Sequence, residues 1–508
     1  MEFIDNFLNK ITMYRLVLYY LIGLTVITVW FGFLKIIPYS PVLILFSALI
    51  FLAVCWATNI VFSVVFSALT NVESVFISAL ILTMIVPPPK TFSDLTFIGW
   101  AAILAMASKY LLNIKHKHIF NPVAIAVVLT SFGFGKSATW WVGSISLMPF
   151  VVLGGLLIVR KLKKGKMINA FLLSAVLMVA ASSYFQGGKV TDIITALNAT
   201  FFHSSLFFFA FVMLTEPLTM PATDFFQIIY GALIGTLFAP EVHVASIYST
   251  PELALIAGNL FAYLASPKER LILQLKEKIQ TAPDMIDFIF PRPKNMSFVP
   301  GQYMEWTLPH EDADDRGNRR YFTLASSPTE DNIRVGIKFY RQGSSYKKSL
   351  ASRDGQLVIA AGQRAGDFTL PDDASQKCVF MAGGIGITPF RSMIKYLLDK
   401  SEKRDIILMY ANKCAPEIIY RDVFDQAENN LGIKTIYTLT DVDSIQPDWT
   451  GRRGRFDADS IKQLVGDYKN RVYYLSGPHE MVKGFEATIK NLGISKENIK
   501  TDFFPGFV

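Results

Sequence analysis

A glycine-rich segment carries the clearest chemical signal in this sequence. Residues 378–389 read Cys-Val-Phe-Met-Ala-Gly-Gly-Ile-Gly-Ile-Thr-Pro, an apolar run followed by glycines and the start of a helical pattern. Glycines let backbone amides approach a phosphate closely, and the positive end of a helix favours an anion there. The segment therefore predicts a pyrophosphate site between a strand and a helix. The residues that would form it are Gly383, Gly384, Gly386, Thr388 and Pro389.

Four further motifs accompany this segment, because one glycine-rich turn alone is weak evidence. Arg320-Tyr321-Phe322-Thr323 places a guanidinium, which matches phosphate geometry, beside aromatic rings and a hydroxyl. Pro300-Gly301-Gln302-Tyr303 precedes it, Gly343-Ser344-Ser345-Tyr346-Lys347 follows it, and Ser476-Gly477-Pro478 comes last. Each residue alone could belong to ordinary sheet structure, but five motifs in this order argue against that interpretation.

Together these motifs closely resemble the ferredoxin–NADP reductase superfamily over residues 283–508. The resemblance implies that Arg320 pairs with the pyrophosphate of FAD. It also implies that Tyr321, Phe322 and Thr323 hold the isoalloxazine, with the Thr323 hydroxyl near N5, where it helps orient the ring. Further phosphate contacts fall to Gly343, Ser344, Ser345 and Lys347. The glycine segment would bind NAD(P)H with Gly477 and Pro478, and the catalytic positions would be Thr323 and Ser476.

Two positions depart from that family's pattern. The family often has Cys before Gly-Pro, where this chain has Ser476, which is similar in size and can still line the nicotinamide site. The family's C-terminal aromatic residue corresponds to Phe504 or Phe507, and the residues leave the choice open; Phe507 is taken as the predicted flavin contact.

The residues after the second strand of the nucleotide domain bear on the choice of dinucleotide. An acid there would favour NADH by binding the ribose hydroxyls, and a basic cluster would favour NADPH. The segment Tyr410-Ala411-Asn412-Lys413 has neither, and Lys413 and Arg421 are isolated. We favour NADH over NADPH.

The elements that position these groups follow from periodicity. Residues 284–290, 302–308, 321–325 and 333–340 alternate with period two between turns, which predicts a small antiparallel barrel. Short apolar strands then alternate with helices, as in a parallel doubly wound sheet. We therefore expect a connector helix at 267–282, an FAD-binding β-barrel at 283–375 and an NAD(P)-binding α/β domain at 376–508.

The first 266 residues differ in composition from the rest. They contain 14 Lys and Arg and 9 Asp and Glu, against 35 and 32 in the remaining residues. This asymmetry excludes a single soluble globule, a disordered chain and a secreted disulfide scaffold. The net charge of +8 belongs largely to membrane topology, so nucleic acid is not an expected partner. Only three cysteines occur, widely spaced, and we expect no metal site.

The first part of the chain reads as a polytopic α-helical membrane domain, because a span takes about 20 mostly apolar residues. The cationic cluster 160–166 marks the inner face and places everything after Ser266 in the cytoplasm. We predict about ten spans, at 12–34, 41–66, 74–88, 92–112, 120–134, 140–159, 168–185, 201–217, 225–240 and 252–265.

An internal repeat relates the two parts of this domain. At an offset of 132 residues, Leu82-Thr83 matches Leu214-Thr215 and Thr91 matches Thr223. Both copies break an apolar segment with prolines, as discontinuous helices at a binding site do. Prolines that merely end helices in loops are the other interpretation. Glu216, at the second break, is either a functional acid at membrane depth or a residue of a water-facing loop.

The motifs Phe120-Asn121-Pro122, 215–219 and 231–235 resemble the D subunit of the Rnf electron-transport complex and the B subunit of the sodium-pumping NADH:quinone reductase. The resemblance covers residues 1–266 and implies ten spans in an inverted repeat that binds flavin. It also implies FMN in phosphoester linkage on Thr139, in Lys136-Ser137-Ala138-Thr139, where the family's glycine is missing. The alternative for Thr139 is a helix cap before two tryptophans.

Together, the two parts imply electron transfer from cytosolic NAD(P)H through FAD into or across a cell (inner) membrane. A quinone, an extracytoplasmic flavoprotein or another electron-transport subunit is compatible as acceptor. The alternative function is a redox-driven or redox-regulated ion transporter. A two-haem design would need four membrane histidines and is excluded, because only His203 of the six histidines lies in a predicted span.

Overall fold

The contacts within the computed structural model divide the chain into two units, Met1–Arg270 and Leu271–Val508, which are described separately. The described residues are 4, 7–8, 11–66, 72–114, 117–239, 241–266, 270–310, 313–314, 317–340, 343–353, 357–441, 443 and 445–504. Of the predicted site residues, Phe507 lies outside them. For Phe504 the structure describes the backbone but not the side chain.

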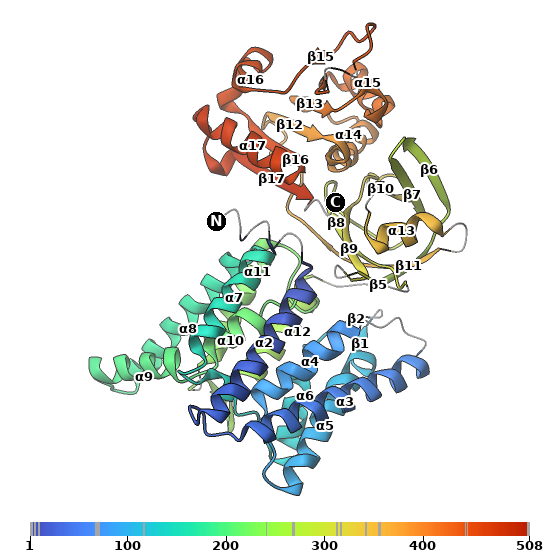
Figure 1. Ribbon diagram of the computed structural model, residues 1–508. Helices are drawn as coiled ribbons and strands as arrows, with labels where there is room; N and C mark the ends of the chain where they lie inside the picture. The colour runs from blue at the N-terminus through green and yellow to red at the C-terminus, as the bar shows by residue number, and fades with distance from the viewer. Residues whose placement is uncertain are drawn as a thin grey trace. The chain divides into compact units, whose positions relative to one another are not determined.

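The first unit is built from helices (Figure 1). In chain order they are α2 (Met13–Phe33), α3 (Pro41–Val65), α4 (Val72–Ile85), α5 (Phe92–Leu111), α6 (Pro122–Phe134), η1 (Trp141–Gly143), α7 (Met148–Leu162), α8 (Gly165–Phe185), α9 (Val190–Phe202), α10 (Leu206–Phe208), η2 (Phe209–Met213), α11 (Asp224–Phe238) and α12 (Pro251–Ala265). Two hairpins join them, β1 (Asn113–Ile114) with β2 (Lys117–His118), and β3 (His243–Val244) with β4 (Ile247–Tyr248).

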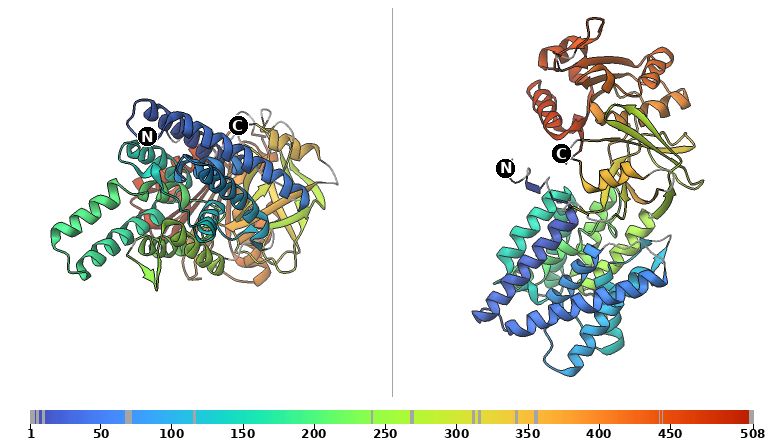
Figure 2. Two further views of the ribbon diagram at one scale, coloured as in Figure 1. Left: turned by 90° about the horizontal axis from the view of Figure 1, so that it is seen from below. Right: turned by 45° about the vertical axis from the view of Figure 1, so that its right-hand side comes forward.

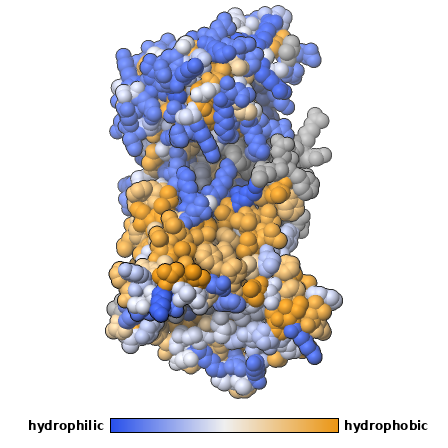
Figure 3. Space-filling view, turned by 90° about the vertical axis from the view of Figure 1, so that its left-hand side faces the viewer, coloured by the Kyte–Doolittle hydropathy of each residue, from blue (hydrophilic) through white to orange (hydrophobic). Residues whose placement is uncertain are grey.

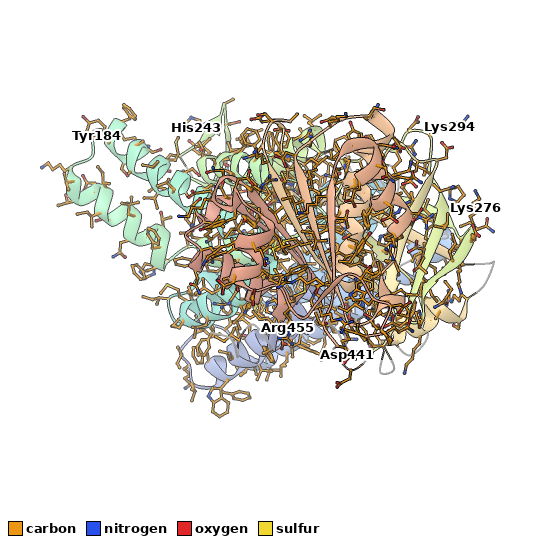
Figure 4. All side chains as sticks on the ribbon, turned by 90° about the horizontal axis from the view of Figure 1, so that it is seen from above. Tyr184, His243, Lys276, Lys294, Asp441 and Arg455 are labelled. Carbon is orange, nitrogen blue, oxygen red and sulfur yellow. The ribbon has the colours of Figure 1, made fainter. Side chains whose placement is uncertain are left out.

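Small residues allow close helix packing in this unit. A Cβ on Gly231 or Gly235 of α11 would overlap backbone oxygens of α8, so the two helices approach within backbone contact. This spacing of two glycines four residues apart is the pattern that brings helices together in membranes. In contrast, α8 and α9 project beyond the other helices, with Tyr184 near their outer end (Figure 4 and the left view of Figure 2).

The surface of the helical unit is strongly apolar. Figure 3 shows a broad band of hydrophobic side chains over one of its faces, with hydrophilic side chains gathered at one end. Large apolar side chains that are more than half exposed include Val26, Leu49, Val64, Leu173 and Leu177. Exposed apolar area of this extent is typical of a surface that contacts lipid or another protein.

The ten predicted spans are not supported. Among the described residues, α2, α3 and α8 are long and apolar enough to cross a membrane, and α9 with the segment 206–213, bent by 55°, could form a fourth span. The apolar helices α4, α6, α11 and α12 have only 13 to 15 residues. At 1.5 Å per residue they fall short of a hydrocarbon core of about 30 Å.

The prediction counted as spans four apolar segments, 74–88, 120–134, 225–240 and 252–265, that are themselves shorter than the roughly 20 residues of a full span, and the helices formed there are equally short. The helix α6 begins at Pro122 and ends before Gly135, whose φ of 64° lies in the left-handed region. Pro and Gly at these places end a helix whatever the hydropathy of the flanking residues. The repeat is nevertheless visible, since Thr91 and Thr223 are the N-cap residues of α5 and α11, each after a proline-containing break.

The second unit begins with two antiparallel sheets. Their orders are β6–β7–β10 and β5–β11–β8–β9, and the helix α13 packs Tyr346 and Leu350 into their shared core. The strands are β5 (Arg270–Gln274), β6 (Glu277–Ala282), β7 (Met285–Pro291), β8 (Tyr303–Thr307), β9 (Arg319–Thr323), β10 (Asn332–Lys338) and β11 (Val358–Ala365), and α13 spans Ser345–Ser352. The arrangement agrees with the predicted antiparallel barrel.

The connector helix predicted at 267–282 is wrong, because β5 and β6 occupy most of this range. Leu271, Leu273 and Leu275 are all buried in the barrel core. Their period of two is a strand signal that outweighs the alternating Lys and Glu residues on which the helix prediction rested.

A six-stranded parallel sheet follows, in the order β15–β14–β13–β12–β16–β17. Its elements are β12 (Cys378–Gly383), η3 (Gly384–Ile387), α14 (Thr388–Lys400), β13 (Ile406–Asn412), η4 (Ala415–Glu417), α15 (Arg421–Leu431), β14 (Lys434–Leu439), β15 (Arg452–Arg453), α16 (Ala458–Leu464), η6 (Tyr468–Asn470), β16 (Val472–Pro478), α17 (His479–Asn491), η7 (Lys496–Asn498) and β17 (Ile499–Phe504).

Helices cover both faces of this sheet. Phe380 of β12 packs with α14 and α15 in one core cluster, while Met381 packs with α16 and α17 in another (Figure 1). The strand β12 is therefore buried along its whole length. Since the chain runs from β12 outward to β14 and returns to β16, the order of strands reverses between β12 and β16. Doubly wound sheets bind nucleotides at such a switch point.

Candidate functional site

The strand β9 presents its side chains alternately to two faces, and this alternation separates the two adjacent arginines. Arg320 is 7% exposed, and its guanidinium carbon lies 4.9 Å from the ring centroid of Tyr346 in α13. Its Nη1 donates to the carbonyl oxygens of Gly317 and Arg319. Arg319 pairs instead with Glu305, at 3.5 Å. The structure thus directs Arg320, and not Arg319, toward the first turn of α13.

The first turn of α13 and Arg320 together form an anion site. The backbone N of Ser345 donates to Oδ2 of Asp314 at 2.9 Å, and Oδ1 of Asp314 lies 3.7 Å from Nη2 of Arg320. A carboxylate of this chain therefore already contacts both the guanidinium and the positive end of the helix. Ser344 caps the helix by accepting from the N of Lys347. This donor set fits a phosphate group, which binds helix N-termini and guanidinium groups for the same reasons.

Phe322 and Thr323 complete the strand predicted to hold a flavin ring. The Phe322 ring lies 6.1 Å from that of Tyr346, on the same side as Arg320. Thr323, on the opposite face, is 4% exposed and pairs in register with Tyr303. Tyr321 packs edge-on against Tyr303 and donates its hydroxyl to Glu305 at 2.9 Å. Arg320, Phe322 and the start of α13 are therefore brought together, whereas Tyr321 lies apart from them.

Two predicted phosphate contacts have other partners. Nζ of Lys347 donates to the carbonyl oxygen of Lys338 at 2.6 Å and lies over the ring of Tyr340. The backbone N of Gly343 donates to the carbonyl oxygen of Tyr340, which closes the turn before α13. Lys347 and Gly343 thus stabilise the turn that leads into α13.

The glycine segment lies at the switch point of the sheet. Gly384 has a φ of 51°, in the left-handed region, and η3 leads directly into α14, where Pro389 suits the first turn because it lacks an N–H. A Cβ on Gly386 would lie 2.5 Å from the carbonyl carbon of Ser476 and 2.6 Å from Cα of Gly477. The two motifs, 90 residues apart in the sequence, are thus in backbone contact, which brings the predicted dinucleotide residues together.

Ser476 lies in the buried part of β16 at this contact. It is fully buried, and its Oγ has no hydrogen-bond partner among the described residues. A buried hydroxyl without a partner costs free energy, so such a group marks a place where a ligand can bind. Thr388, in contrast, donates its hydroxyl to the carbonyl oxygen of Ile385 and stabilises the turn of the glycine segment.

Thr139 lies in a firmly held segment of the helical unit. Its backbone N and that of Trp140 both donate to the carbonyl oxygen of Ile85, at 2.9 and 3.0 Å. Lys136 pairs with Asp94 at 2.6 Å, and the indole of Trp140 donates to Glu252. The residue Thr139 itself is exposed. An exposed residue on a fixed backbone fits the acceptor of a phosphoester.

A second polar cluster surrounds Glu216. Its Oε2 accepts from Nδ2 of Asn121 at 2.7 Å and from the hydroxyl of Thr219 at 3.1 Å, and His118 lies 3.7 Å from Oε1. The backbone N of Asn121 donates to Asn259. The motifs Phe120-Asn121-Pro122 and 215–219 thus meet at the Glu216 carboxylate.

Sequence reasoning missed three residues at these sites. Tyr346 belongs to the predicted motif 343–347, but its contact with Arg320 joins α13 to β9 and leaves no local signal in the sequence. Asp314 lies in an acidic loop that reads as a solvated turn. Glu417 follows β13 by five residues and lies between Lys413 and Arg421, the two cations weighed for the choice of dinucleotide. Its pairing with Lys338 of β10 leaves no local signal in the sequence.

Comparison with known proteins matches residues 380–487 to the oxidoreductase NAD-binding domain. The C-terminal unit therefore contains an NAD-binding oxidoreductase domain. Together with the barrel and the switch-point geometry, this match supports the predicted ferredoxin–NADP reductase-like arrangement of residues 283–508. The resemblance of residues 1–266 to the Rnf and sodium-pumping subunits stays a prediction.

The alignments with curated relatives cover less than half of this chain. A flavohemoprotein of Bacillus cereus is 24% identical over 235 residues, 44% of this chain and 58% of the relative. The stachydrine N-demethylase reductase subunit Stc4 of Rhizobium meliloti is 25% identical over 236 residues, 46% of this chain and 66% of the relative. The chain thus spans less than two thirds of the length of either. A crystal structure of Amycolatopsis cytochrome P450 reductase GcoB aligns with a TM-score of 0.42 and 22% identity, over 47% of this chain and 72% of that one.

Proposed function

We propose that this protein is a membrane-bound, FAD-dependent NADH oxidoreductase that passes electrons from cytosolic NADH into or across the membrane. The observation that carries the proposal is the backbone contact between the glycine segment and Ser476-Gly477, in a unit whose barrel also groups anion-binding donors at Arg320 and α13. FAD, when bound, would accept a hydride as an electron pair and release electrons singly.

The residues of this chain would act mainly by holding the flavin and the dinucleotide in place, and less by acid–base chemistry. Arg320 and the N-terminus of α13 would hold the flavin phosphates, while Phe322 and Thr323 would hold the ring. The backbone of 383–389 would hold the dinucleotide pyrophosphate, and the Ser476 hydroxyl would donate to the nicotinamide amide. A hydride moves directly between two rings, so holding them in contact supplies most of the rate acceleration. Anaerobic bleaching of the bound flavin by NADH tests this proposal.

Glu417 supports NADH as the donor. It follows β13, the second strand of the sheet, where an acid accepts hydrogen bonds from the ribose hydroxyls of NADH and repels the phosphate of NADPH. Oε1 of Glu417 pairs with Lys338 at 3.2 Å, and Oε2 would accept from the ribose.

Replacing Glu417 by glutamine should lower the preference for NADH over NADPH about tenfold, because a charge that repels the 2′-phosphate is lost. The measurement is the ratio of kcat/KM for the two dinucleotides. Asp284→Asn is the matched control, since Asp284 also pairs with Lys338, at 3.0 Å, and should leave the ratio unchanged. An equal effect of both variants would assign the change to Lys338 and contradict the ribose role.

The helical unit would carry the electrons onward. Its three long apolar helices support membrane association, and we infer a multi-pass protein of the cell (inner) membrane whose C-terminal domains are cytoplasmic. The expected acceptor is a quinone or an extracytoplasmic flavoprotein, with other electron-transport subunits as further candidates. FMN on Thr139 would supply a one-electron carrier in this unit.

Thr139→Ala should abolish any covalent flavin, because the substitution removes the only oxygen of that side chain that could form the phosphoester. The expected result is loss of fluorescence from the denatured protein band, with the non-covalent FAD content unchanged. Ser137→Ala, two residues away in the same segment, is the control and should keep the fluorescence. A fluorescent band in Thr139→Ala, or none in the wild type, would contradict the assignment.

Ion transport driven or regulated by redox is the second candidate function. The Glu216 cluster favours it, because a carboxylate held by a histidine, an asparagine and a threonine in an apolar unit is costly and is usually functional. Ion uptake measured beside electron transfer in the same vesicles separates the two functions.

A further inference from the structure

The helix α14 does more than present the glycine segment at its N-terminus. Its next residues, Arg391 and Ser392, reach the loop that directly follows the flavin strand β9. Arg391 is 5% exposed and Ser392 is fully buried, so both contacts are shielded from water. One helix therefore links the predicted dinucleotide site to the predicted flavin site.

Arg391 and Ser392 supply four hydrogen bonds of this link, and further along α14 the carboxylate of Asp399 accepts another from the Thr329 hydroxyl of the same loop. Nη1 of Arg391 donates to the carbonyl oxygen of Ala325 at 2.7 Å and to Oε2 of Glu330 at 2.8 Å, while Nη2 donates to Oε1 at 2.9 Å. The hydroxyl of Ser392 donates to the carbonyl oxygen of Ser326 at 2.6 Å. The Arg391–Glu330 pair is bidentate, which fixes orientation as well as distance.

A second group of contacts orients the Arg391 side chain. Its guanidinium carbon lies 5.2 Å from the ring centroid of Tyr420, and the Tyr420 hydroxyl donates to Asp287 at 2.6 Å. Asp287 is fully buried and also pairs with Arg334 at 2.6 Å. Strands β7 and β10 of the barrel are thus joined to the start of α15, so the link extends over both domains of this unit.

The protonation states of Glu330 and Tyr420 keep these contacts intact at neutral pH. Burial alone would raise the pKa of Glu330, but the hydrogen bonds and the charge of Arg391 outweigh it and hold that pKa below its usual range. Burial, and next the charge of Asp287, raise the pKa of Tyr420 well above its usual value. Glu330 therefore stays ionised and Tyr420 stays protonated at neutral pH, and the contacts do not titrate there.

We propose that Arg391 and Ser392 are positioning residues that fix the glycine segment relative to the end of the flavin strand, and so set the approach of the nicotinamide to the flavin. This inference rests on the proposed function. Neither residue needs to touch either ring, because a misplacement of about 1 Å between the reacting groups can cost about 100-fold in rate.

The test is stopped-flow reduction of the FAD-loaded, full-length protein by NADH without oxygen. Arg391→Gln and Glu330→Gln should each slow flavin reduction at saturating NADH about 10- to 100-fold and weaken the long-wavelength absorbance of the stacked nicotinamide–flavin complex. FAD content and the Kd for NADH should stay within about threefold of the wild type. The double variant should be no slower than the slower single variant, because both substitutions break one contact.

Three further variants separate positioning from stability. Ser392→Ala removes one hydrogen bond with little change in volume and should slow reduction in the same way by a smaller factor. Lys400→Ala removes an exposed side chain at the C-terminal end of α14 and should behave as the wild type. Arg391→Lys keeps the charge but not the bidentate geometry and should recover only part of the rate.

The possible failures are distinguishable. If NADH fails to reduce the wild type although FAD is bound, the proposed function fails, and this inference fails with it. If the wild type is reduced and Arg391→Gln, Glu330→Gln and Ser392→Ala all match it, the inference alone fails. If the variants lose rate only in proportion to lost FAD, their role is structural and positioning is refuted.

Discussion

Replacing Arg320 by glutamine should weaken FAD binding about 100-fold, because a guanidinium held beside a phosphate provides charge-assisted hydrogen bonds that an amide cannot. Arg320 is buried against Tyr346 and faces the N-terminus of α13, where Asp314 already shows that an anion is accepted. The measurement is titration of the flavin-depleted protein with FAD, followed by flavin fluorescence.

Arg319→Gln is the matched control for this prediction. Arg319 is the preceding residue of the same strand, but it points to the opposite face and pairs with Glu305. Its loss should change FAD affinity by less than about threefold, because Arg319 lies on the face of β9 away from α13, and the cost of breaking its largely buried pair falls on folding stability instead. Equal weakening in both variants would refute the assignment of the phosphate site to Arg320, since general destabilisation of β9 would then explain both.

Gly386→Ala should reduce the rate of NADH-dependent flavin reduction at least 100-fold while FAD stays bound. The added Cβ would overlap the backbone of Ser476 and Gly477, so the glycine segment and the end of β16 must move apart. Overpacking of this kind typically costs about 1–3 kcal/mol, and here it also displaces the surface on which the dinucleotide would lie. The measurement combines the NADH reduction rate with chemical reduction by dithionite.

Two comparisons make the Gly386 result specific. Dithionite should reduce the flavin of the variant as fast as that of the wild type, because this reaction needs no dinucleotide site. Gly484→Ala, in the helix α17 where a Cβ meets open space, should be neutral or slightly stabilising. A Gly386→Ala protein that is reduced by NADH at the wild-type rate would exclude this segment as the dinucleotide site.

The second half of the chain was largely predictable because its signals are local. The strand predicted at 284–290 lies within one residue of its predicted bounds, and the glycine segment lies between strand and helix as its sequence indicates. The motif also indicated Arg320, and strand alternation explains why the adjacent Arg319 lies on the other face. Local periodicity and turn residues decide these features, so one sequence is sufficient.

The remaining features depend on packing that a single sequence does not display. Arg391 and Glu330 are 61 residues apart, and nothing near either predicts the pair. The predicted number of spans is not supported, because the prediction counted short apolar segments whose helices have only 13 to 15 residues. The strand β5 was missed because Leu271 and Leu273 are buried only once the barrel forms around them.

The central claim is that electrons from NADH enter the membrane unit through FAD. The direct test uses sealed vesicles that carry the full-length protein with its cytoplasmic side outward and an impermeant acceptor trapped inside. External NADH should reduce the trapped acceptor in the wild type, and Gly386→Ala should abolish this reduction while retaining FAD. Ion uptake without acceptor reduction would favour the transporter. A trapped acceptor that stays oxidised, in vesicles whose FAD is bound and bleached by NADH, would contradict electron transfer across the membrane.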